Sequence, residues 1–367
     1  MRARSAPALM AVTAALAGTA FAGIPAGYYD PAAGLEGEAL RAALHGIIDD
    51  HESISYDAIW LAFYTTDDRP DGYVWDMYSD IPGGTPPYLY TFGEDEGGSA
   101  GAEGQGYNRE HSWPKSWFGD QAPMNTDLFH IVPTDIYVNN RRGSYPFGEV
   151  ASPTWTSMNG SRLGPCSWPG YSGTVFEPID AFKGDFARNY FYMATRYYTE
   201  DAGWPGSPMT SGSQLLEWAE GMLIAWHLSD PVGAKELDRN EAVYAIQENR
   251  NPFIDHPEYV LMIYEPTGIE YPDEAPSLVA AAASPNPFSG SVGIVFTLSA
   301  PAEVDLTVYD VYGREVVAVL DDAAYCAGEH GIEWDGSGGS GEAVPPGVYL
   351  CRIAVPGADS VCQVLKL

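Results

Sequence analysis

The chain has 367 residues, enough for two domains with cores of their own. Its hydrophobic fraction of 45% excludes global disorder. The formal net charge of −32 argues against a surface that attracts nucleic acid everywhere, because phosphate binding is driven by Lys and Arg.

The first 22 residues have the pattern of a secretory signal peptide. Arg2 and Arg4 precede a mainly apolar run from Ala8 to Ala20, and Ala20-Phe21-Ala22 is a small-x-small cleavage site. The alternative is a membrane anchor, but the run is shorter than a spanning helix needs, and no later segment is apolar enough to cross a bilayer. We therefore expect residues 1–22 to be removed and the chain, without a membrane span, to be secreted or held at the cell surface.

Residues 23–264 are predicted to form the first domain. Apolar residues recur at helical spacing from Leu35 to Asp50, and Tyr88 to Phe92 resembles a strand. The pattern then predicts strand, long loop, strand and helix between Tyr107 and Tyr145, with Pro133 and Thr134 at the helix start and Gly143 at its end. Further helices are expected over 180–198, 213–227 and 234–249.

A Pro- and Ala-rich stretch over residues 265–287 is predicted to be a linker. Beyond it, the alternation of apolar and polar residues predicts short strands over 292–298, 304–309, 315–320, 331–334 and 348–355. Their spacing of about ten residues is typical of a small all-β sandwich over residues 288–367. Three of the four cysteines (Cys326, Cys351 and Cys362) lie here, where one disulfide could form in an exported protein. The spacing does not say which pair would form it.

The central segment contains the residue types that phosphodiester hydrolysis needs. His111 can act as a base near neutral pH, and Glu110 and Asn139 can offer oxygen ligands to a hard divalent cation. Arg142 lies one turn after Asn139 and can bind a phosphate oxygen. Because adjacent strand residues face opposite sides, Glu110 and His111 can share a site only if the strand is bulged or ends there.

Local charge does not oppose a phosphodiester substrate in this segment. Residues 101–200 contain eight Lys or Arg against ten Asp or Glu, so most of the net acidity lies in the flanks. Arg109, Arg141 and Lys115 are the candidate substrate-binding residues. A satisfied surface histidine and a solvated carboxylate are the ordinary interpretations of His111 and Glu110 taken singly, so their combination carries the hypothesis.

Four blocks of the sequence resemble the bacterial endonuclease I family of secreted nucleases, which has a ββα-metal (His-Me finger) core. They are NREHSWPKSWFG (108–119), DLFHIVPTDIYVNNRRGSYPFGEV (127–150), KGDFARNYFYMATRYY (183–198) and AWHLSDPVGAKELDRNEAVYAIQENRNPFIDHPE (225–258). The resemblance implies that His111 is the general base and that Glu110 and Asn139 bind the metal. Some members carry a phosphate-binding arginine in the loop after the histidine. Residues 112–138 contain Lys115 but no arginine, so Arg142 is the candidate for that task.

The C-terminal motifs resemble a second group of domains. VYDVYGR (308–314), WDG (334–336) and PGVYL (346–350) are similar to immunoglobulin-like tails of flagellar hook-cap proteins and of type-nine secretion substrates. Contact with secretion machinery is therefore an expected partner interaction of this part of the chain.

The sequence as a whole predicts an α+β protein, with a mainly helical nuclease domain containing a ββα-metal finger, followed by an immunoglobulin-like sandwich. The expected activity is cleavage of DNA, with RNA as a further substrate, with little sequence preference and with Mg²⁺, or alternatively Ca²⁺ or Mn²⁺, as cofactor. One rival is an exported binding or surface protein that has the fold but no activity. Another is a metal-dependent phosphodiesterase for small substrates.

Overall fold

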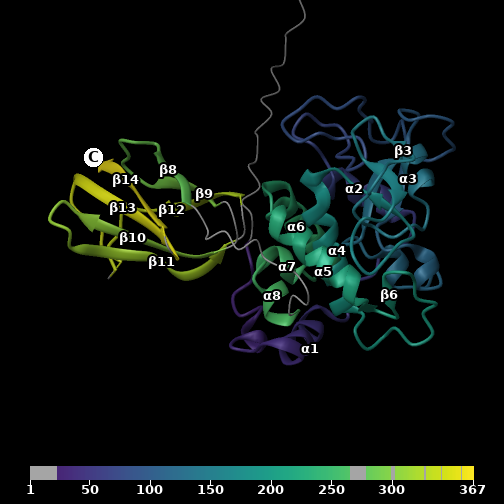
Figure 1. Ribbon diagram of the computed structural model, residues 1–367, viewed down its shortest axis with the longest axis horizontal. Coiled ribbons are helices and arrows are strands. Elements are labelled where there is room, and N and C mark those ends of the chain that lie inside the picture. Colours follow the sequence, from purple (N-terminus) through teal and green to yellow (C-terminus); the bar gives the residue numbers. More distant parts are fainter. Residues whose placement is uncertain (1–22, 265–277, 299–301, 326–327, 340, 357) are drawn as a thin grey trace, which may run out of the picture.

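The computed structural model describes residues 23–264, 278–298, 302–325, 328–339, 341–356 and 358–367. Within these ranges the chain has two parts, a mainly helical N-terminal region (residues 23–264) and an all-β tail (residues 278–367), which Figure 1 shows as separate bodies. The predicted signal peptide over residues 1–22, Cys326 and residues 265–277 of the predicted linker lie outside the described residues. No helix in the described part of the chain combines the length and apolar character that crossing a bilayer requires.

The first helices of the N-terminal region pack against its core through apolar faces. Helix α1 (Gly37–Ile48) confirms the helix expected over 35–50, and it buries Leu40, Leu44 and Ile48. Helix α2 (Ala58–Thr66) was not predicted. The strand expected over Tyr88–Phe92 is wrong. This segment has no strand pairing, and Tyr90 instead donates a hydrogen bond through its hydroxyl to Asp135 Oδ2 (2.5 Å).

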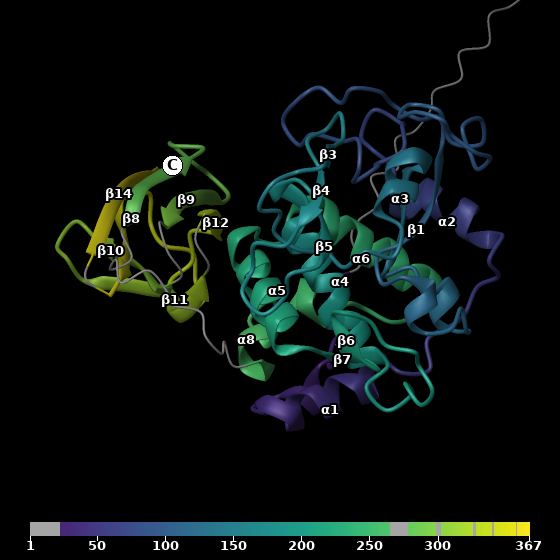
Figure 2. The same cartoon turned by 45° about the vertical axis from the view of Figure 1, so that its right-hand side comes forward.

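A hairpin and a helix follow in the predicted order. Strand β1 (Tyr107–His111) pairs antiparallel with β2 (Ile131–Asp135), and helix α3 (Ile136–Arg142) starts directly afterwards. Pro133 and Thr134 belong to β2 rather than to the helix, because Asp135 caps the helix by accepting a hydrogen bond from the Val138 amide (2.8 Å). Gly143 ends the helix with a positive φ of 55°. Figure 2 shows β1 and α3 on the side of this region away from the tail.

The centre of the N-terminal region is helix α4 (Lys183–Arg196), all of whose residues are buried. A helix buried on every face requires neighbours all round, and α5 (Glu217–Ser229), α6 (Ala234–Gln247), α7 (Pro252–Asp255) and α8 (Tyr259–Ile263) follow it in sequence. The helices expected over 180–198, 213–227 and 234–249 are thereby confirmed. The remaining elements are short: β3 (Trp155–Thr156), β4 (Arg162–Pro165), β5 (Thr174–Glu177), β6 (Thr210–Ser211), β7 (Gln214–Leu215), η1 (Asp30–Ala32), η2 (Lys115–Trp117), η3 (Met124–Thr126) and η4 (Asp180–Phe182).

The tail is built from two antiparallel sheets around their own apolar core, as the alternating pattern predicts. One sheet has the order β11-β10-β13-β14 and the other β12-β9-β8. The strands are β8 (Leu278–Ser284), β9 (Val292–Leu298), β10 (Ala302–Asp310), β11 (Glu315–Tyr325), β12 (Gly328–Trp334), β13 (Gly347–Val355) and β14 (Ala358–Lys366). The predicted linker was too long, because residues 278–284 form β8 and pair with β9.

Candidate active site

Glu110 lies on β1, opposite Val132, with only 3% of its surface exposed. Its Oε1 atom accepts hydrogen bonds from the Tyr78 hydroxyl (2.9 Å) and from Arg142 Nη1 (2.7 Å). Among the described residues, none donates a hydrogen bond to Oε2. Burial raises the pKa of Glu110, and the positive charge of Arg142 opposes that rise. The carboxylate is therefore held by one oxygen and has the other available for a ligand.

Arg142 lies in the interior and organises the end of β1. Its Nη1 atom also donates to the His111 carbonyl (2.9 Å), and its Nη2 atom donates to the Ser112 carbonyl (2.6 Å). Only 1% of its side chain is exposed. The expectation that Arg142 binds a substrate phosphate does not fit this position, because its guanidinium is enclosed and directed at the protein's own carbonyl and carboxylate oxygens.

His111 is the last residue of β1, so the strand ends where a site shared by Glu110 and His111 would require it to end. It is 5% exposed, and its Nε2 atom lies 3.2 Å from the Asn125 carbonyl oxygen. Because a carbonyl only accepts, Nε2 carries the hydrogen and the neutral ring keeps its lone pair on Nδ1. Burial lowers the pKa of His111 well below its usual value, so the ring is neutral at neutral pH.

An aromatic and cationic cluster adjoins the histidine. The Tyr56 ring is stacked near His111, with centroids 6.1 Å apart and planes at 20°. The guanidinium carbon of Arg109 lies 3.8 Å from the Tyr56 ring centroid, and Lys115 Nζ lies 5.2 Å from it. The structure thus brings two of the predicted substrate-binding residues together beside His111. Sequence reasoning missed Tyr56, which lies far from the motif along the chain and has no local signal.

Asn139 and Arg141 occupy different surroundings on α3. Asn139 is half-buried, and among the described residues its side chain makes no hydrogen bond. It lies three residues before Arg142, so it shares the helix face that reaches Glu110. Arg141 is exposed and packs on Tyr137 and Trp155, with its guanidinium carbon 5.0 and 5.9 Å from the two ring centroids. It is therefore not part of the cluster around Tyr56.

The free side-chain oxygens of Glu110 and Asn139 are of the kind that binds a divalent cation. Glu110 Oε2 is a carboxylate oxygen and Asn139 Oδ1 is an amide oxygen, and neither is used by the protein's own hydrogen bonds within the described ranges. Hard cations such as Mg²⁺ prefer oxygen ligands and keep several waters, so two protein ligands are sufficient. Tyr78, which orients Glu110, is a further residue that the sequence did not indicate.

A second group of potential ligands is already occupied by an arginine. His45, Asp49 and Glu200 offer atoms within 4.8 Å of one another. Arg196 Nη1 lies 2.8 Å from Asp49 Oδ1 and 2.5 Å from Glu200 Oε1. The guanidinium neutralises these carboxylates, so the group is explained as an ion-pair network.

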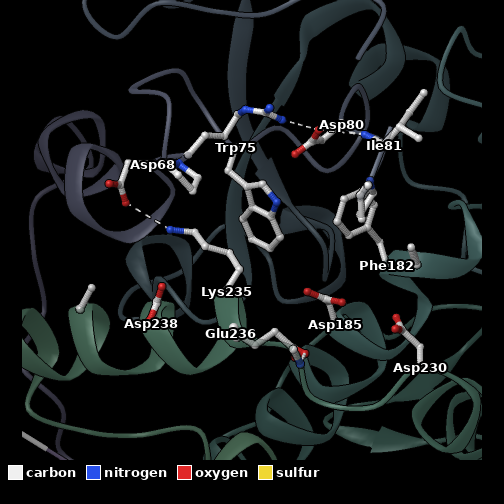
Figure 3. Close-up of a pocket in the computed structure, with 18 of the residues that line it drawn as sticks. Asp68, Trp75, Asp80, Ile81, Phe182, Asp185, Asp230, Lys235, Glu236 and Asp238 are labelled. Atoms are coloured by element: carbon white, nitrogen blue, oxygen red, sulfur yellow. Dashed lines mark hydrogen bonds and ion pairs between the residues drawn. The ribbon is translucent and has the colours of Figure 1, made fainter. Parts of the chain in front are cut away.

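A cavity of about 1020 Å³ lies elsewhere in the N-terminal region and is lined by residues of α2, the loop after it, the start of α4 and most of the length of α6. Figure 3 shows Asp185, Asp230 and Glu236 on one side of it and Trp75 on the other. Its lining does not include Glu110, His111 or Asn139. This cavity and the candidate catalytic residues are therefore separate features.

Comparison with known proteins gives both parts of the chain a family. The sequence model of endonuclease I matches residues 36–258, and that of the FlgD immunoglobulin-like domain matches residues 285–358. The chain is 38% identical to a protein named extracellular ribonuclease from Bacillus amyloliquefaciens, over 63% of this chain and 76% of that protein. Its counterpart from Bacillus subtilis is 36% identical over the same shares. An endonuclease-1 from Buchnera aphidicola is 25% identical over 36% of this chain and 46% of that protein.

The matched region contains β1, β2 and α3, and with them Glu110, His111 and Asn139. It covers well over half of the chain. The chain therefore belongs to the endonuclease I family of nucleases and has an immunoglobulin-like domain after the nuclease region.

Proposed function

We propose that this chain is an exported, metal-dependent endonuclease that hydrolyses phosphodiester bonds of nucleic acid with little sequence preference. The observation that carries the proposal is the arrangement at the end of β1. There the carboxylate of Glu110 is fixed by Tyr78 and Arg142 through one oxygen only, next to a histidine that is oriented by a backbone carbonyl.

In this proposal His111 is the general base. Its Nε2–H bond to Asn125 fixes the ring, and Nδ1 accepts the proton of the attacking water. Glu110 and Asn139 hold the divalent cation, with Mg²⁺ as the first candidate and Ca²⁺ and Mn²⁺ as alternatives. When bound, such an ion stabilises the negative charge that develops on the phosphate and leaving oxygens.

Arg109 and Lys115 are proposed to bind phosphates beside the cleaved bond. Of the eight basic residues between 101 and 200, Arg109 and Arg141 make no ion pair with any described residue, whereas Lys115 pairs with exposed Asp120 at 3.2 Å. Unpaired or weakly paired cations are available to phosphate. Arg142 is proposed to position Glu110 instead, and Arg141, which is exposed on α3, would contact more distant phosphates.

The substrate proposal covers both RNA and DNA. A site that handles backbone phosphate distinguishes bases poorly, which fits low sequence preference. We favour RNA as a substrate because the two Bacillus relatives are named ribonucleases, whereas the Buchnera relative is named an endonuclease.

The direct test incubates the purified chain with supercoiled plasmid and with long single-stranded RNA, in Mg²⁺ and in excess chelator. The proposal expects cleavage of at least one substrate in Mg²⁺ and none in chelator. Binding without cleavage would establish the inactive rival, and turnover confined to a small phosphodiester would establish the small-substrate rival. Cleavage that continues in chelator would overturn the role of the metal.

Export is proposed from the signal-peptide pattern of residues 1–22 and from the relatives' description as extracellular. Contact of the tail with secretion machinery remains a proposal based on its resemblance. Mass spectrometry of the chain recovered from the culture medium should show Gly23 as the first residue. Retention of residues 1–22 in the exported chain would contradict the cleavage proposal.

A further inference from the structure

Two cysteines of the tail face each other across neighbouring strands. Strands β13 and β14 pair antiparallel, and in their register Cys351 lies directly opposite Cys362. The sequence left the pairing of the tail cysteines open, and this register selects two of them. Residues directly opposite in an antiparallel pair place their side chains on the same face of the sheet.

That face is the inner one. Cys351 is fully buried in the tail core, between Tyr349 and Ile353 in the alternation of β13. Cys362 is half-buried and in phase with buried Val364 on β14. Both thiols therefore point into the same side of the sheet.

The backbone spacing is also suitable. The Phe288 amide donates to the Leu365 carbonyl (2.9 Å), and the Leu367 amide donates to the Phe288 carbonyl (2.8 Å), so the odd-numbered residues of β14 turn their polar groups away from β13. Cys362, an even-numbered residue, then forms a hydrogen-bonded pair with Cys351, for which the Cα separation is roughly 5.5 Å. Disulfides occur at that Cα separation.

We propose that Cys351 and Cys362 form a disulfide in the exported protein, which fastens β14 to β13. The oxidant is a small-molecule disulfide of the glutathione type. The thiolate of one cysteine attacks it, forming a mixed disulfide and releasing one thiol. The second cysteine then attacks the first one's sulfur and releases the second thiol, so two protein thiols lose two protons and two electrons in all.

The two thiols differ in exposure, and this difference assigns the steps. Cys351 is fully buried, whereas Cys362 is half-buried. Cys362 is therefore the first attacking group, and Cys351 closes the bond.

The bond would matter because β14 is an edge strand. It ends the order β11-β10-β13-β14, so β13 is its one strand neighbour in that sheet, and the Phe288 backbone is bonded to its outer edge. Cys166 is in the N-terminal region, where its thiol lies 3.8 Å from the Trp168 carbonyl, and it serves as an internal control. Because the proposal depends on the tail register and on export, its failure would leave the nuclease proposal unaffected.

The test uses the full chain, refolded in a mixture of oxidised and reduced glutathione and alkylated without reduction. Trypsin cuts after Arg352, between the two cysteines, and a Glu-specific protease cuts after Glu342, which separates Cys351 from Cys326. We expect a linked pair of peptides containing Cys351 and Cys362, with Cys166 alkylated. Alkylation of both Cys351 and Cys362, or linkage of either to Cys326, would overturn the proposal.

A second measurement guards against misfolding during refolding. Adding a reductant should lower the urea midpoint of the tail in the wild type but not in the Cys351→Ala, Cys362→Ala double variant, while nuclease activity stays unchanged in both. Equal midpoints with and without reductant in the wild type would count against the bond.

Discussion

Two buried arginine–glutamate pairs of the N-terminal region differ in how much of the carboxylate the arginine occupies. Between α4 and α6, Arg188 binds both oxygens of Glu236, with Nε and Nη2 each at 2.6 Å, and the Gly233 amide adds a third hydrogen bond (3.0 Å). At β1, Arg142 binds only Oε1 of Glu110, a contact shared with Tyr78.

We propose that the difference separates a structural pair from a pair that leaves an oxygen for a ligand. A buried carboxylate needs partners for its oxygens, and Glu236 obtains all of them from the protein. Within the described part of the chain, Glu110 obtains partners for Oε1 only, from Tyr78 and Arg142. Asn139 lies on the same face of α3 as Arg142. Removing one member of either pair should therefore lower stability, but only the pair at β1 should affect catalysis.

The largest effect is expected at the group proposed to move the proton. His111→Ala should reduce cleavage by about 10²- to 10⁴-fold, because a positioned general base contributes that much. His256→Ala is the matched control, since that histidine pairs with Glu258 at 3.0 Å away from the site and should leave the rate unchanged. Initial rates on RNA and plasmid, with folding checked by circular dichroism, decide the outcome. A rate within twofold of wild type for His111→Ala would refute the assignment of the base.

The next effect concerns the second proposed metal ligand. Asn139→Ala should lower the apparent Mg²⁺ affinity, measured through cleavage, by at least about 10- to 100-fold. Loss of an outer partner of a metal site already lowers metal affinity by that factor. Asn140→Ala is the control, because Asn140 is the exposed neighbour on another helix face. Cleavage rates over a Mg²⁺ titration provide the comparison. Equal Mg²⁺ dependence in both variants would remove Asn139 from the site.

Arg142→Met should lower both the Mg²⁺ affinity and the stability of the protein. Loss of its contact with Glu110 frees the carboxylate to move, and we expect Mg²⁺ affinity to fall by about 10- to 100-fold. Stability should also fall by about 3–5 kcal/mol, because Glu110 is left as a buried charge without its partner. Urea denaturation and a Mg²⁺ titration measure the two effects. Unchanged affinity in the folded protein would show that Arg142 does not position Glu110.

Arg188→Met is the matching change in the other pair. It should lower the free energy of unfolding by a similar 3–5 kcal/mol, since Glu236 loses two hydrogen bonds and its counter-charge. Activity per folded molecule should remain that of the wild type. A loss of activity that exceeds the loss of folded protein would erase the distinction between the two pairs.

The smallest effect is a pH dependence of stability beside Arg188. His227 Nε2 donates to the Pro257 carbonyl (3.0 Å), and burial, assisted by the charge of Arg188, lowers the pKa of His227 to about 3. A histidine in the unfolded chain titrates near ~6.5. Between these values the unfolded chain binds the extra proton. The free energy of unfolding therefore falls as the pH drops below about 6.5, by at most ~1.4 kcal/mol per pH unit from this group.

The contribution of His227 to this pH dependence is measured by comparing urea midpoints of the wild type and of His227→Asn from about pH 7 down to pH 4.5. We expect the difference in stability between the two proteins to shrink with falling pH. A difference that stays constant over this range would show that His227 does not titrate as its burial requires.

The sequence was sufficient to predict a secondary-structure element where the residues that determine it are close together in the chain. The order of β1, β2 and α3 follows from one contiguous segment, and the strands β9 to β13 follow from alternation. Strand β8 was missed because its Ala-rich composition gives little strand signal, although pairing with β9 determines its conformation. Strand β14, in which exposed valine and leucine break the contrast between faces, was also missed.

The details of the site could not be predicted, because they depend on contacts between distant positions. Tyr78 meets Glu110 across 32 residues, and Tyr56 reaches His111 from the segment before α2. Arg142 was expected on the same face of α3 as Asn139, but helical periodicity does not distinguish an arginine that binds substrate from one enclosed by carbonyl oxygens.

The most direct test is a calorimetric Mg²⁺ titration of the wild type, Glu110→Gln and Glu236→Gln, without substrate. Because Glu110 is proposed to bind the ion through its remaining oxygen, Glu110→Gln should lose Mg²⁺ binding, and Glu236→Gln should bind as the wild type does. Unchanged binding by Glu110→Gln, in a protein that is folded by circular dichroism, would contradict the proposed metal site.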